Sequence, residues 1–306
     1  MSTEKVIIVF LDGVGLGEDK AETNPFAAHQ MPFLQSLLDG RKPILANAGY
    51  SNGTATLLGL DAGLDVAGLP QSGTGQTAIL TGRNAPAELG QHSGPYPNRE
   101  LKAMLAEGNL FADLLARNRP VAYAGAYPDG FLNRLKRGKG RLSANTRAAL
   151  LAGLKIRGPN DLQAGRAVSG LLTNQYWQEW GYDVPLLTPQ QAGAQLVDLA
   201  QDHVLTYFEF WYTDVVGHKQ DMDQAQQLLD LLDPFFAGIV AAVDLEKTLV
   251  LIISDHGNFE DLSTKHHTPN PAMALAIGRE HRLAAERLRS LPDIAPVVVN
   301  LFDPSP

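Results

Sequence analysis

The sequence contains no cysteine, which excludes disulfide bonds, thiolate metal sites and cysteine nucleophiles. It also lacks an excess of positive charge, because its formal net charge is -8 at pH 7. That balance argues against nucleic-acid binding by general electrostatics. No apolar run is long enough to cross a bilayer, and the run Val6–Leu11 is too short for a secretory signal. The composition therefore predicts a soluble, cytoplasmic protein with no membrane or nucleic-acid partner.

Continuous apolar runs are present, and they resemble strands rather than helices. Runs without polar alternation are typical of strands covered on both faces, as in a parallel sheet. Helical patterns lie between them, so the sequence predicts an α/β fold with a mostly parallel sheet flanked by helices. The strand-like runs are Val6–Leu11, Pro120–Ala124, Val204–Trp211, Leu249–Ser254 and Pro296–Asn300. The helical patterns are Met31–Leu38, Ala103–Arg117, Pro189–Gln201 and Ala225–Val243.

One internal stretch, residues 130–187, has a different composition. It begins with the basic segment FLNRLKRGKGRL and continues with Gly, Asn, Gln and Trp in weak periodicity. We expect a small cap here, inserted into an α/β core of residues 1–129 and 188–306. Trp177 and Trp180 are typical of packing inside such a cap, and a place on a substrate pocket is the alternative.

Acidic residues and histidines follow three of the strand-like runs. Asp12 ends the first run, Asp214 and His218 follow the second, and Asp255 and His256 end the third. An Asp after a strand is often only a turn residue or a helix cap. In a parallel sheet, however, ligands bind at the carboxyl ends of the strands, where these residues would meet. The conjunction therefore predicts a metal site built from oxygen and nitrogen ligands.

Two further histidines, His266 and His267, lie shortly beyond the third run in the segment KHHTPNP. With one or both of them, the acids and histidines suffice for two adjacent divalent metal sites. Paired metals clamp the attacking and leaving oxygens in phosphoryl transfer.

A candidate nucleophile lies in the segment LPQSGTGQTAILTGR, in which Ser72 precedes two glycines and a helical pattern. A helix N-terminus favours a bound phosphate, and metal coordination would activate the serine hydroxyl. The simpler interpretation is that Ser72 is an N-cap. On local grounds alone, Thr74 is a competing nucleophile.

These segments resemble the alkaline phosphatase superfamily, and in particular the branch that holds cofactor-independent phosphoglycerate mutase and phosphopentomutase. The matching stretches are VIIVFLDGVGLG, QSGTGQTAILTGR, TDVVGH, SDHGN and HTPNP, in the order found in that family. The resemblance implies a cap inserted after the nucleophile, Ser72 as that nucleophile, and two Mn or Zn ions. One implied metal site consists of Asp12, Ser72, Asp255 and His256. The other consists of Asp214, His218 and His267, with His267 preferred over His266 because Thr-x-Asn-Pro follows it.

The sequence departs from the mutases around the nucleophile. Where they have Asn-Ser-Glu-Val-Gly-His, this chain has Gln71-Ser72-Gly73-Thr74-Gly75-Gln76, without the acid and the histidine. The spacing between this segment and Asp214 is also shorter than in bacterial phosphoglycerate mutase. We therefore expect a two-metal phosphohydrolase, a phosphatase or phosphodiesterase, that forms a phosphoserine on a small phosphorylated substrate.

Two alternatives remain at this stage: a phosphomutase acting on phosphoglycerate or a phosphosugar, and a catalytically silent metal-binding protein. Candidate substrate contacts are of two kinds, residues beside the nucleophile and basic residues of the cap. A solvated charged loop is the alternative interpretation of the basic group. The candidates are Thr74, Gln76, Arg134, Lys136 and Arg137.

Overall fold

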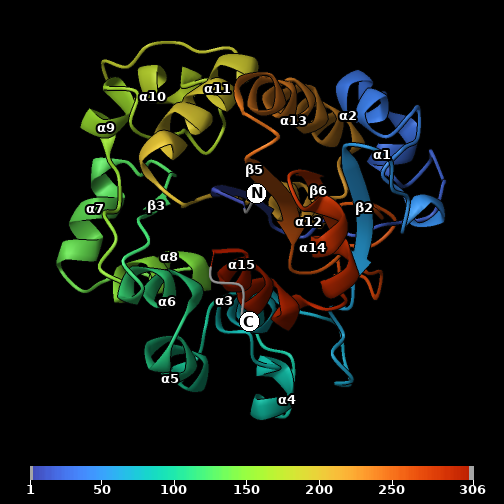
Figure 1. Cartoon of the computed structure of the whole chain (residues 1–306), viewed down its shortest axis with the longest axis horizontal. Helices are drawn as coiled ribbons and strands as arrows, with labels where there is room; N and C mark the ends of the chain where they lie inside the picture. The colour runs from blue at the N-terminus through green and yellow to red at the C-terminus, as the bar shows by residue number, and fades with distance from the viewer. Residues whose placement is uncertain (1–2, 303–306) are drawn as a thin grey trace.

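A six-stranded sheet lies at the centre of the molecule, and the computed structural model describes residues 3–302 around it (Figure 1). The strand order is β2-β6-β5-β1-β4-β3. Strands β5, β1, β4 and β3 are parallel neighbours, whereas β6 is antiparallel to both β5 and β2. The predicted α/β class with a mostly parallel sheet is thus confirmed. The strands are β1 (Lys5–Leu11), β2 (Ala55–Leu60), β3 (Val121–Tyr123), β4 (Leu205–Phe210), β5 (Thr248–Ser254) and β6 (Ala272–Gly278).

Both faces of the sheet are buried, which explains the continuous apolar runs. Successive side chains of a strand point to opposite faces, and in β1 the two sets enter two different hydrophobic clusters. Ile8 belongs to one cluster and Ile7 to the other. Each face therefore needs its own layer of helices.

Helices cover the two faces separately (Figure 1). The first face is covered by α3 (Ser72–Thr81), α4 (Ala85–Leu89), α5 (Arg99–Glu107), α6 (Leu110–Ala116), α8 (Ala144–Leu151), α14 (His281–Arg287) and α15 (Ile294–Phe302). The second is covered by α1 (Pro25–Ala28), α2 (Pro32–Leu37), α11 (Pro189–Leu199), α12 (Tyr212–Lys219) and α13 (Met222–Ala242). Short 3-10 turns occur at Leu45–Asn47, Ala200–Asp202 and Leu291–Asp293.

Three short helices lie beside the β3 edge, on the left in Figure 1: α7 (Asp129–Lys136), α9 (Pro159–Gln163) and α10 (Gln175–Glu179). Beside them is a third, small hydrophobic cluster made of Ala126, Leu162, Ala167, Trp177 and Val184, and we call these three helices, the cluster and the segments that join them the cap. Helix α8 falls in the same stretch of sequence but packs into the first large cluster through Ala144 and Ala148.

Two sequence-based expectations for the elements need correction, and two strands were missed. Pro296–Asn300 is not a strand, because it forms the middle of α15; a proline is tolerated in the first turn of a helix. Ala103–Arg117 is not one helix, because Gly108 ends α5 and the Asn109 side chain caps α6. Strands β2 and β6 were not predicted at all.

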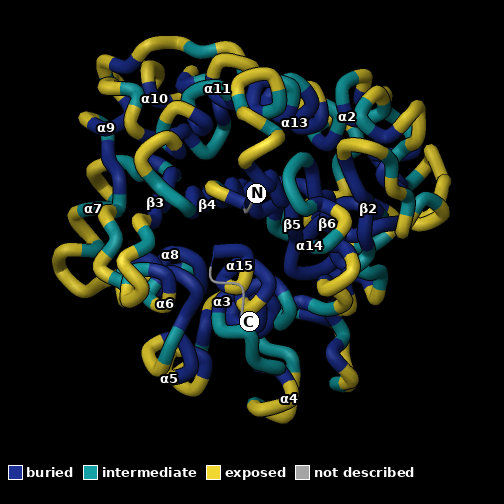
Figure 2. The backbone as a smooth tube through the Cα atoms, in the orientation of Figure 1, coloured by how far each residue is buried: buried dark blue, intermediate teal, exposed yellow. Residues whose placement is uncertain are grey.

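The strands and the helix faces against them form the buried interior, and exposed residues lie mainly on the outer helices and loops (Figure 2). Within residues 3–302, no helix combines the length and apolar character needed to span a bilayer.

Candidate metal centre and nucleophile

Asp12 and Asp255 lie side by side because their strands are parallel neighbours. The register pairs Leu11 with Ser254, so both carboxylates emerge at the same edge of the sheet. Gly13 follows with a positive φ of 67°, and its N–H donates to Asp255 Oδ1 over 3.2 Å. A Cβ at position 13 would lie 2.6 Å from Asp214 Oδ1. Glycine therefore allows the carboxylate of Asp214 to approach this edge.

Helix α12 begins directly after β4 and presents Asp214 and His218 one turn apart. Residues at i and i+4 share a helix face, and His218 Nε2 lies 3.2 Å from Asp214 Oδ2. Because β4 pairs with β1, this helix starts beside Asp12. Strand β4 and helix α12 thus bring the carboxylate of Asp214 to the sheet edge where Asp12 and Asp255 lie.

The three histidines of the site are oriented by backbone carbonyls. The Nδ1 atom of His218 lies 2.7 Å from the carbonyl of Lys265, and that of His267 lies 2.6 Å from the carbonyl of Pro70. His256 Nδ1 faces the carbonyl of Gly257 at 3.4 Å. A carbonyl only accepts, so each Nδ1 donates and each Nε2 faces the centre of the site. This second-sphere orientation is characteristic of metal-binding histidines.

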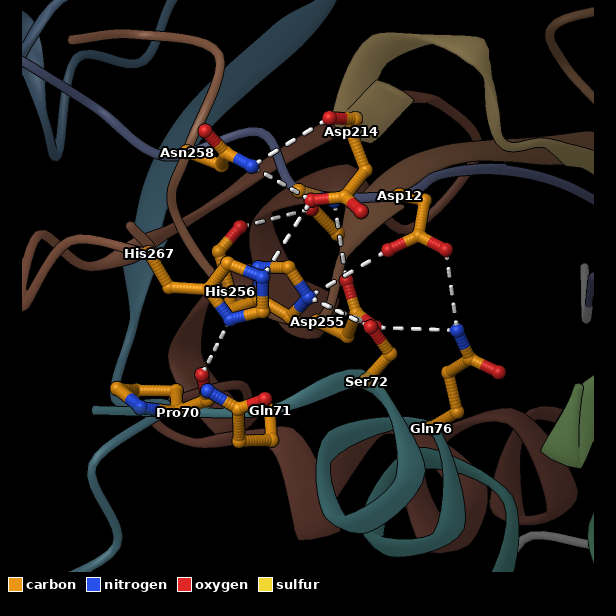
Figure 3. A network of polar contacts seen from close by, with 12 residues as sticks. Asp12, Pro70, Gln71, Ser72, Gln76, Asp214, Asp255, His256, Asn258 and His267 are labelled. Carbon is orange, nitrogen blue, oxygen red and sulfur yellow. Dashed lines mark hydrogen bonds and ion pairs between the residues drawn. The ribbon is translucent and has the colours of Figure 1, made fainter. Parts of the chain in front are cut away.

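Ser72 is the first residue of α3, and its Oγ lies 3.0 Å from His256 Nε2 (Figure 3). It is only 4% exposed. Gly75 lets this helix approach the β5 end, because a Cβ there would lie 2.9 Å from the Asp255 carbonyl oxygen. The hydroxyl of Thr74, the competing nucleophile, instead donates to the carbonyl of Gln71 over 3.1 Å.

Gln76 links the carboxylates to the neighbouring helix. Its Nε2 donates to Asp12 Oδ2 over 3.3 Å and to Asp255 Oδ2 over 3.2 Å. Its Oε1 accepts from the N–H of Ala144 at the start of α8. The structure thus places this predicted substrate contact among the carboxylates, as a residue that holds two of them in position.

Asn258 performs a similar function for Asp214, and sequence reasoning did not single it out. Its Nδ2 donates to Asp214 Oδ1 over 2.8 Å (Figure 3). The signal was available, because Asn258 belongs to the SDHGN segment that also holds Asp255 and His256.

The electrostatics show how much negative charge is concentrated here. Burial, together with repulsion from Asp255 and Asp214, raises the pKa of Asp12 well above its usual value. Burial raises the pKa of Asp255 to about 7. For Asp214, burial alone would raise the pKa, but the hydrogen bonds from His218 and Asn258 together with the charges of His256 and His218 outweigh it, and the pKa falls to about 2. Among residues 3–302, the ion-pair partners of these carboxylates are all histidines. The cluster thus contains no permanently charged cation of its own.

A divalent metal ion fits this donor set. Two groups have ligand atoms within 4.8 Å of one another: Asp214 with His218 and His267, and Asp12 with Asp214 and His256. Within residues 3–302, Asp12 Oδ1 is buried without a hydrogen-bond partner, and its ion-pair contact is His256 Nε2 at 3.4 Å. His218 Nε2 and His267 Nε2 lie 3.3 Å apart, where their lone pairs repel unless a proton or a cation lies between them.

The structure brings together all seven residues that the resemblance assigned to the two metal sites. Asp214 takes part in both groups, rather than in one as the resemblance implied. Asp255 and Ser72 adjoin the second group through their contacts with His256. His266 is exposed, whereas His267 is buried and faces Asp214.

A cavity of about 640 Å³ opens onto this site. We call Asp12, Ser72, Gln76 and Asp214 its floor, since these four residues line it at the metal centre. Arg134 and Arg141 line the cavity farther out, whereas the other predicted cap contacts, Lys136 and Arg137, are not among its lining residues.

Glu209 also lines the cavity, and sequence reasoning missed it. It is 7% exposed and accepts hydrogen bonds from Tyr123 Oη and Asn145 Nδ2. Burial raises its pKa. The available signal was an acid inside the apolar run VLTYFEFW, where only a paired or functional carboxylate is expected.

Comparison with known proteins gives consistent results. Residues 181–305 match the family model described as the Metalloenzyme superfamily. The 2,3-bisphosphoglycerate-independent phosphoglycerate mutase of Mycoplasmopsis synoviae (strain 53) is 27% identical over 124 residues, which cover 39% of this chain and 24% of that relative. The protein of the same name from Yersinia pestis (strain Pestoides F) is 33% identical over 97 residues, 29% of this chain and 19% of the relative. The matches thus span a quarter or less of these relatives.

Solved structures match over nearly the whole chain. The phosphoglycerate mutase of Leishmania mexicana has a TM-score of 0.57 at 9% identity, with 99% of this chain and 96% of that chain covered. The PH0037 protein of Pyrococcus horikoshii has a TM-score of 0.56 at 16% identity, with 100% and 98% covered. This chain shares the fold of these two proteins, and its residues 181–305 match a metalloenzyme superfamily. The matched superfamily is one of metalloenzymes, and the converging ligands of this chain provide a place for divalent metal ions.

Proposed function

We propose that this metalloenzyme is a two-metal phosphohydrolase that acts on a small phosphorylated substrate with Ser72 as nucleophile. The observation that carries the proposal is the position of Ser72 Oγ, 3.0 Å from His256 Nε2 and facing the carboxylates of the floor. The ligands would be Asp12, Asp255 and His256 with Ser72 on one side, and Asp214, His218 and His267 on the other. Bound Mn or Zn ions would lower the pKa of the serine hydroxyl and neutralise charge on the phosphoryl oxygens.

The residues of the chain supply positioning and the covalent step. Deprotonated Ser72 Oγ attacks phosphorus, the ester bond breaks, and the departing alkoxide takes a proton from solvent. Water then attacks the phosphoserine, so that inorganic phosphate leaves and the hydroxyl of Ser72 is restored. The N-terminus of α3 favours the negative phosphoryl group during both steps. Gln76 and Asn258 hold the carboxylates in register through their side-chain amides.

Access of water favours hydrolysis over transfer back to the substrate. The cavity extends from the floor to side chains that are in contact with solvent, such as Trp180, which is 57% exposed. A mutase must instead hold the dephosphorylated product until it receives the phosphoryl group again. The histidine and acid of the mutase nucleophile segment are also replaced here by Gln76 and Gly73.

A phosphate-ester screen tests the proposal directly. The protein is stripped of metal, reloaded with Mn²⁺ or Zn²⁺, and incubated with 4-nitrophenyl phosphate and bis(4-nitrophenyl) phosphate, with and without an acceptor alcohol. We expect metal-dependent release of nitrophenol from at least one ester. Absence of cleavage with either metal, together with isomerisation of phosphoglycerate or a pentose phosphate, would reject hydrolysis.

A phosphomutase is the second candidate. The curated relatives carry that name, and Arg134 and Arg141 on the cavity wall could hold a second anionic group of the substrate. The same screen separates the two candidates, because a mutase converts the phosphoglycerate or pentose phosphate without releasing inorganic phosphate.

A further inference from the structure

The aromatic side chains of this protein are distributed unevenly, and the cavity above Ser72 receives many of them. The sequence has three tryptophans, and all three, Trp177, Trp180 and Trp211, line this cavity. Tryptophan is large and apolar, and it is frequent where a protein binds a flat ligand or partner. A cavity lined by every tryptophan of the chain therefore requires a functional explanation.

The exposed apolar side chains also indicate that this cavity has a function. Within residues 3–302, the exposed large apolar side chains comprise four leucines and four aromatic residues. The four aromatic residues all line the cavity, whereas the four leucines do not. The aromatic residues are Tyr96, Tyr176, Trp180 and Trp211, and the leucines are Leu45, Leu69, Leu151 and Leu186. An apolar surface concentrated in one concave site marks a ligand site rather than random exposure.

We call Tyr96, Tyr176, Trp177, Trp180 and Trp211 the aromatic wall. Its members come from separate parts of the fold. Trp177 is 6.1 Å from Trp180 between ring centroids, and both belong to the α10 region of the cap. Trp211 stacks on Tyr212 at 3.9 Å, at the junction of β4 and α12 in the core.

The cap part of the aromatic wall is held in place. Trp177 is 4% exposed, and its indole N–H donates to the hydroxyl of Ser169 over 3.0 Å. Trp180 is the exposed member of this pair. The fixed Trp177 next to the exposed Trp180 forms a preorganised surface on which a ring can stack with little loss of side-chain entropy.

Positive charge lies next to the aromatic wall. Arg134 and Arg141 line the same cavity and are exposed, and the Arg141 guanidinium lies 6.0 Å from the ring centroid of Tyr96. The floor carries acidic residues that face the metal centre, so these arginines are the cationic part of the cavity away from the floor. A guanidinium binds phosphate or carboxylate in a bidentate manner.

We propose that the substrate is a phosphate ester whose leaving group carries an aromatic ring and a second anionic group. The ring would stack on the aromatic wall, and the second anion would bind Arg134 and Arg141, while the scissile phosphate reaches Ser72. This inference rests on the proposed function for its chemistry, but the aromatic wall can be tested by binding alone.

Matched ligands isolate each part of this subsite. Three ligands are compared. Adenosine 5′-monophosphate adds the adenine ring to ribose 5-phosphate, and adenosine 3′,5′-bisphosphate adds a second phosphate to adenosine 5′-monophosphate. They are titrated into Mn²⁺-loaded Ser72→Ala protein, which should bind them without turnover. Since all three tryptophans line the cavity, intrinsic fluorescence excited at a wavelength selective for tryptophan reports on this site.

We expect the adenine ring to lower Kd by about tenfold relative to ribose 5-phosphate, and to change the tryptophan fluorescence. The second phosphate should lower Kd by a further factor of roughly five. Trp180→Leu should remove the advantage of the ring, whereas Leu186→Ala, at an exposed leucine of the same segment outside the cavity, should not. Arg134→Gln should weaken only the bisphosphate, and Arg137→Gln, at the residue directly after the same helix, should leave its Kd unchanged.

Equal Kd values for ribose 5-phosphate and adenosine 5′-monophosphate, or a Trp180→Leu variant that retains the preference, would overturn the inference. Its failure is distinct from failure of the proposed function. If wild-type protein cleaves esters but shows equal kcat/KM for the two monophosphates, the proposed hydrolase function stands and the proposed aromatic subsite is rejected. If the protein binds the adenine ring through Trp180 but cleaves no ester, the proposed subsite stands and the proposed hydrolase function is rejected.

Discussion

The floor of the cavity and its aromatic wall are built in different ways. Three floor residues lie at a strand end or in the first turn of a helix, and Gln76 lies one turn further along α3; around the floor, Asp255 and His256 are fully buried. The polar groups that surround it are oriented by hydrogen bonds to amides and backbone carbonyls. The aromatic wall depends partly on α10, a five-residue helix, and Trp180 is 57% exposed. Under the proposed function, the reaction chemistry is attached to the sheet, whereas ligand selection depends partly on α10, which can change without altering the sheet.

The floor is also surrounded by more buried apolar side chains than the cap is. Two large clusters, one on each face of the sheet, surround the floor, whereas the cap has a separate cluster of five buried residues. Regions with few buried apolar contacts open locally at a lower free-energy cost. We therefore expect changes at the floor to affect catalysis severely, and changes in the cap to affect mainly binding or local stability.

The largest effect is expected for Ser72→Ala. Removal of the nucleophile should lower kcat by roughly 10⁴-fold or more, because no other hydroxyl takes its place. Thr74, the nearest alternative, is engaged with the Gln71 carbonyl. Steady-state ester hydrolysis measures the loss, and mass spectrometry of the quenched wild-type reaction should find phosphate on the peptide that contains Ser72.

The matched control is Thr74→Val, which should retain most of the activity. A Ser72→Ala protein that hydrolyses esters at the wild-type rate would show that the nucleophile lies elsewhere. If neither protein cleaves any ester, yet both bind metal, the chain is a catalytically silent metal-binding protein.

An intermediate effect is expected for Gln76→Leu. The variant loses the donor shared by Asp12 and Asp255 and the acceptor for the Ala144 N–H. Loss of second-sphere hydrogen bonds around a metal typically lowers metal affinity or activity by about 10–100-fold. Titration of activity with Mn²⁺ measures both quantities.

Thr77→Val is the control for Gln76→Leu. Thr77 is buried on the same helix, but its hydroxyl donates to the Gly73 carbonyl instead of the carboxylates. Its variant should keep the metal affinity of the wild type. Equal metal affinities for the Gln76→Leu and Thr77→Val proteins would contradict the positioning function of Gln76.

The smallest effect on catalysis is expected for Asp161→Asn in the cap. Asp161 accepts from Lys155 Nζ over 2.6 Å and from the Gly158 N–H over 3.2 Å. Burial opposes its charge, but these hydrogen bonds outweigh burial and lower its pKa below the usual 3.8. Its stabilising contribution is therefore fully present above pH 3.8 and is lost as pH falls through the lower folded-state pKa.

Urea unfolding of the cap, followed by tryptophan fluorescence, should show Asp161→Asn to be less stable by about 1 kcal/mol at neutral pH. The difference from wild type should stay constant between pH 7 and pH 5, and shrink below pH 3.8. Asp183→Asn, at an exposed position of the same cap, should change little, and kcat should be unaltered in both. A difference that grows on acidification would have the wrong sign for a lowered pKa.

The sheet centre could be predicted from sequence because β1, β4 and β5 are apolar on both faces. Strand β2 reads ATLLGL and β6 reads AMALAIG, and each has only one of the β-branched residues typical of strands, Thr56 in β2 and Ile277 in β6. Their pairing is decided by the tertiary neighbours in the sheet. In α15, the valines of IAPVVVNLF have high strand propensity, but packing against α3 and α6 favours the helix.

The floor could be predicted because parallel strands bring their carboxyl ends together, so Asp12, Asp214 and Asp255 had to meet if the strand assignment was right. The positioning function of Gln76 could not be predicted, because its hydrogen bond with Ala144 joins segments that lie 68 residues apart in the sequence. The aromatic wall could not be predicted either. Trp177 and Trp180 carry no local signal that distinguishes cap packing from a ligand surface, and the difference arises from tertiary structure, which brings them to the same cavity as Trp211.

The most direct test of the central claim is the metal content of the purified protein. Wild-type protein equilibrated with Mn²⁺ and freed of excess metal should retain two ions per chain by elemental analysis. His218→Ala should reduce this to one, because Asp12, Asp255 and His256 remain intact, and Asp214→Asn should lower it further because its carboxylate belongs to both ligand groups. Wild-type protein that retains no stoichiometric divalent metal, while folded and equilibrated with Mn²⁺ or Zn²⁺, would contradict the account.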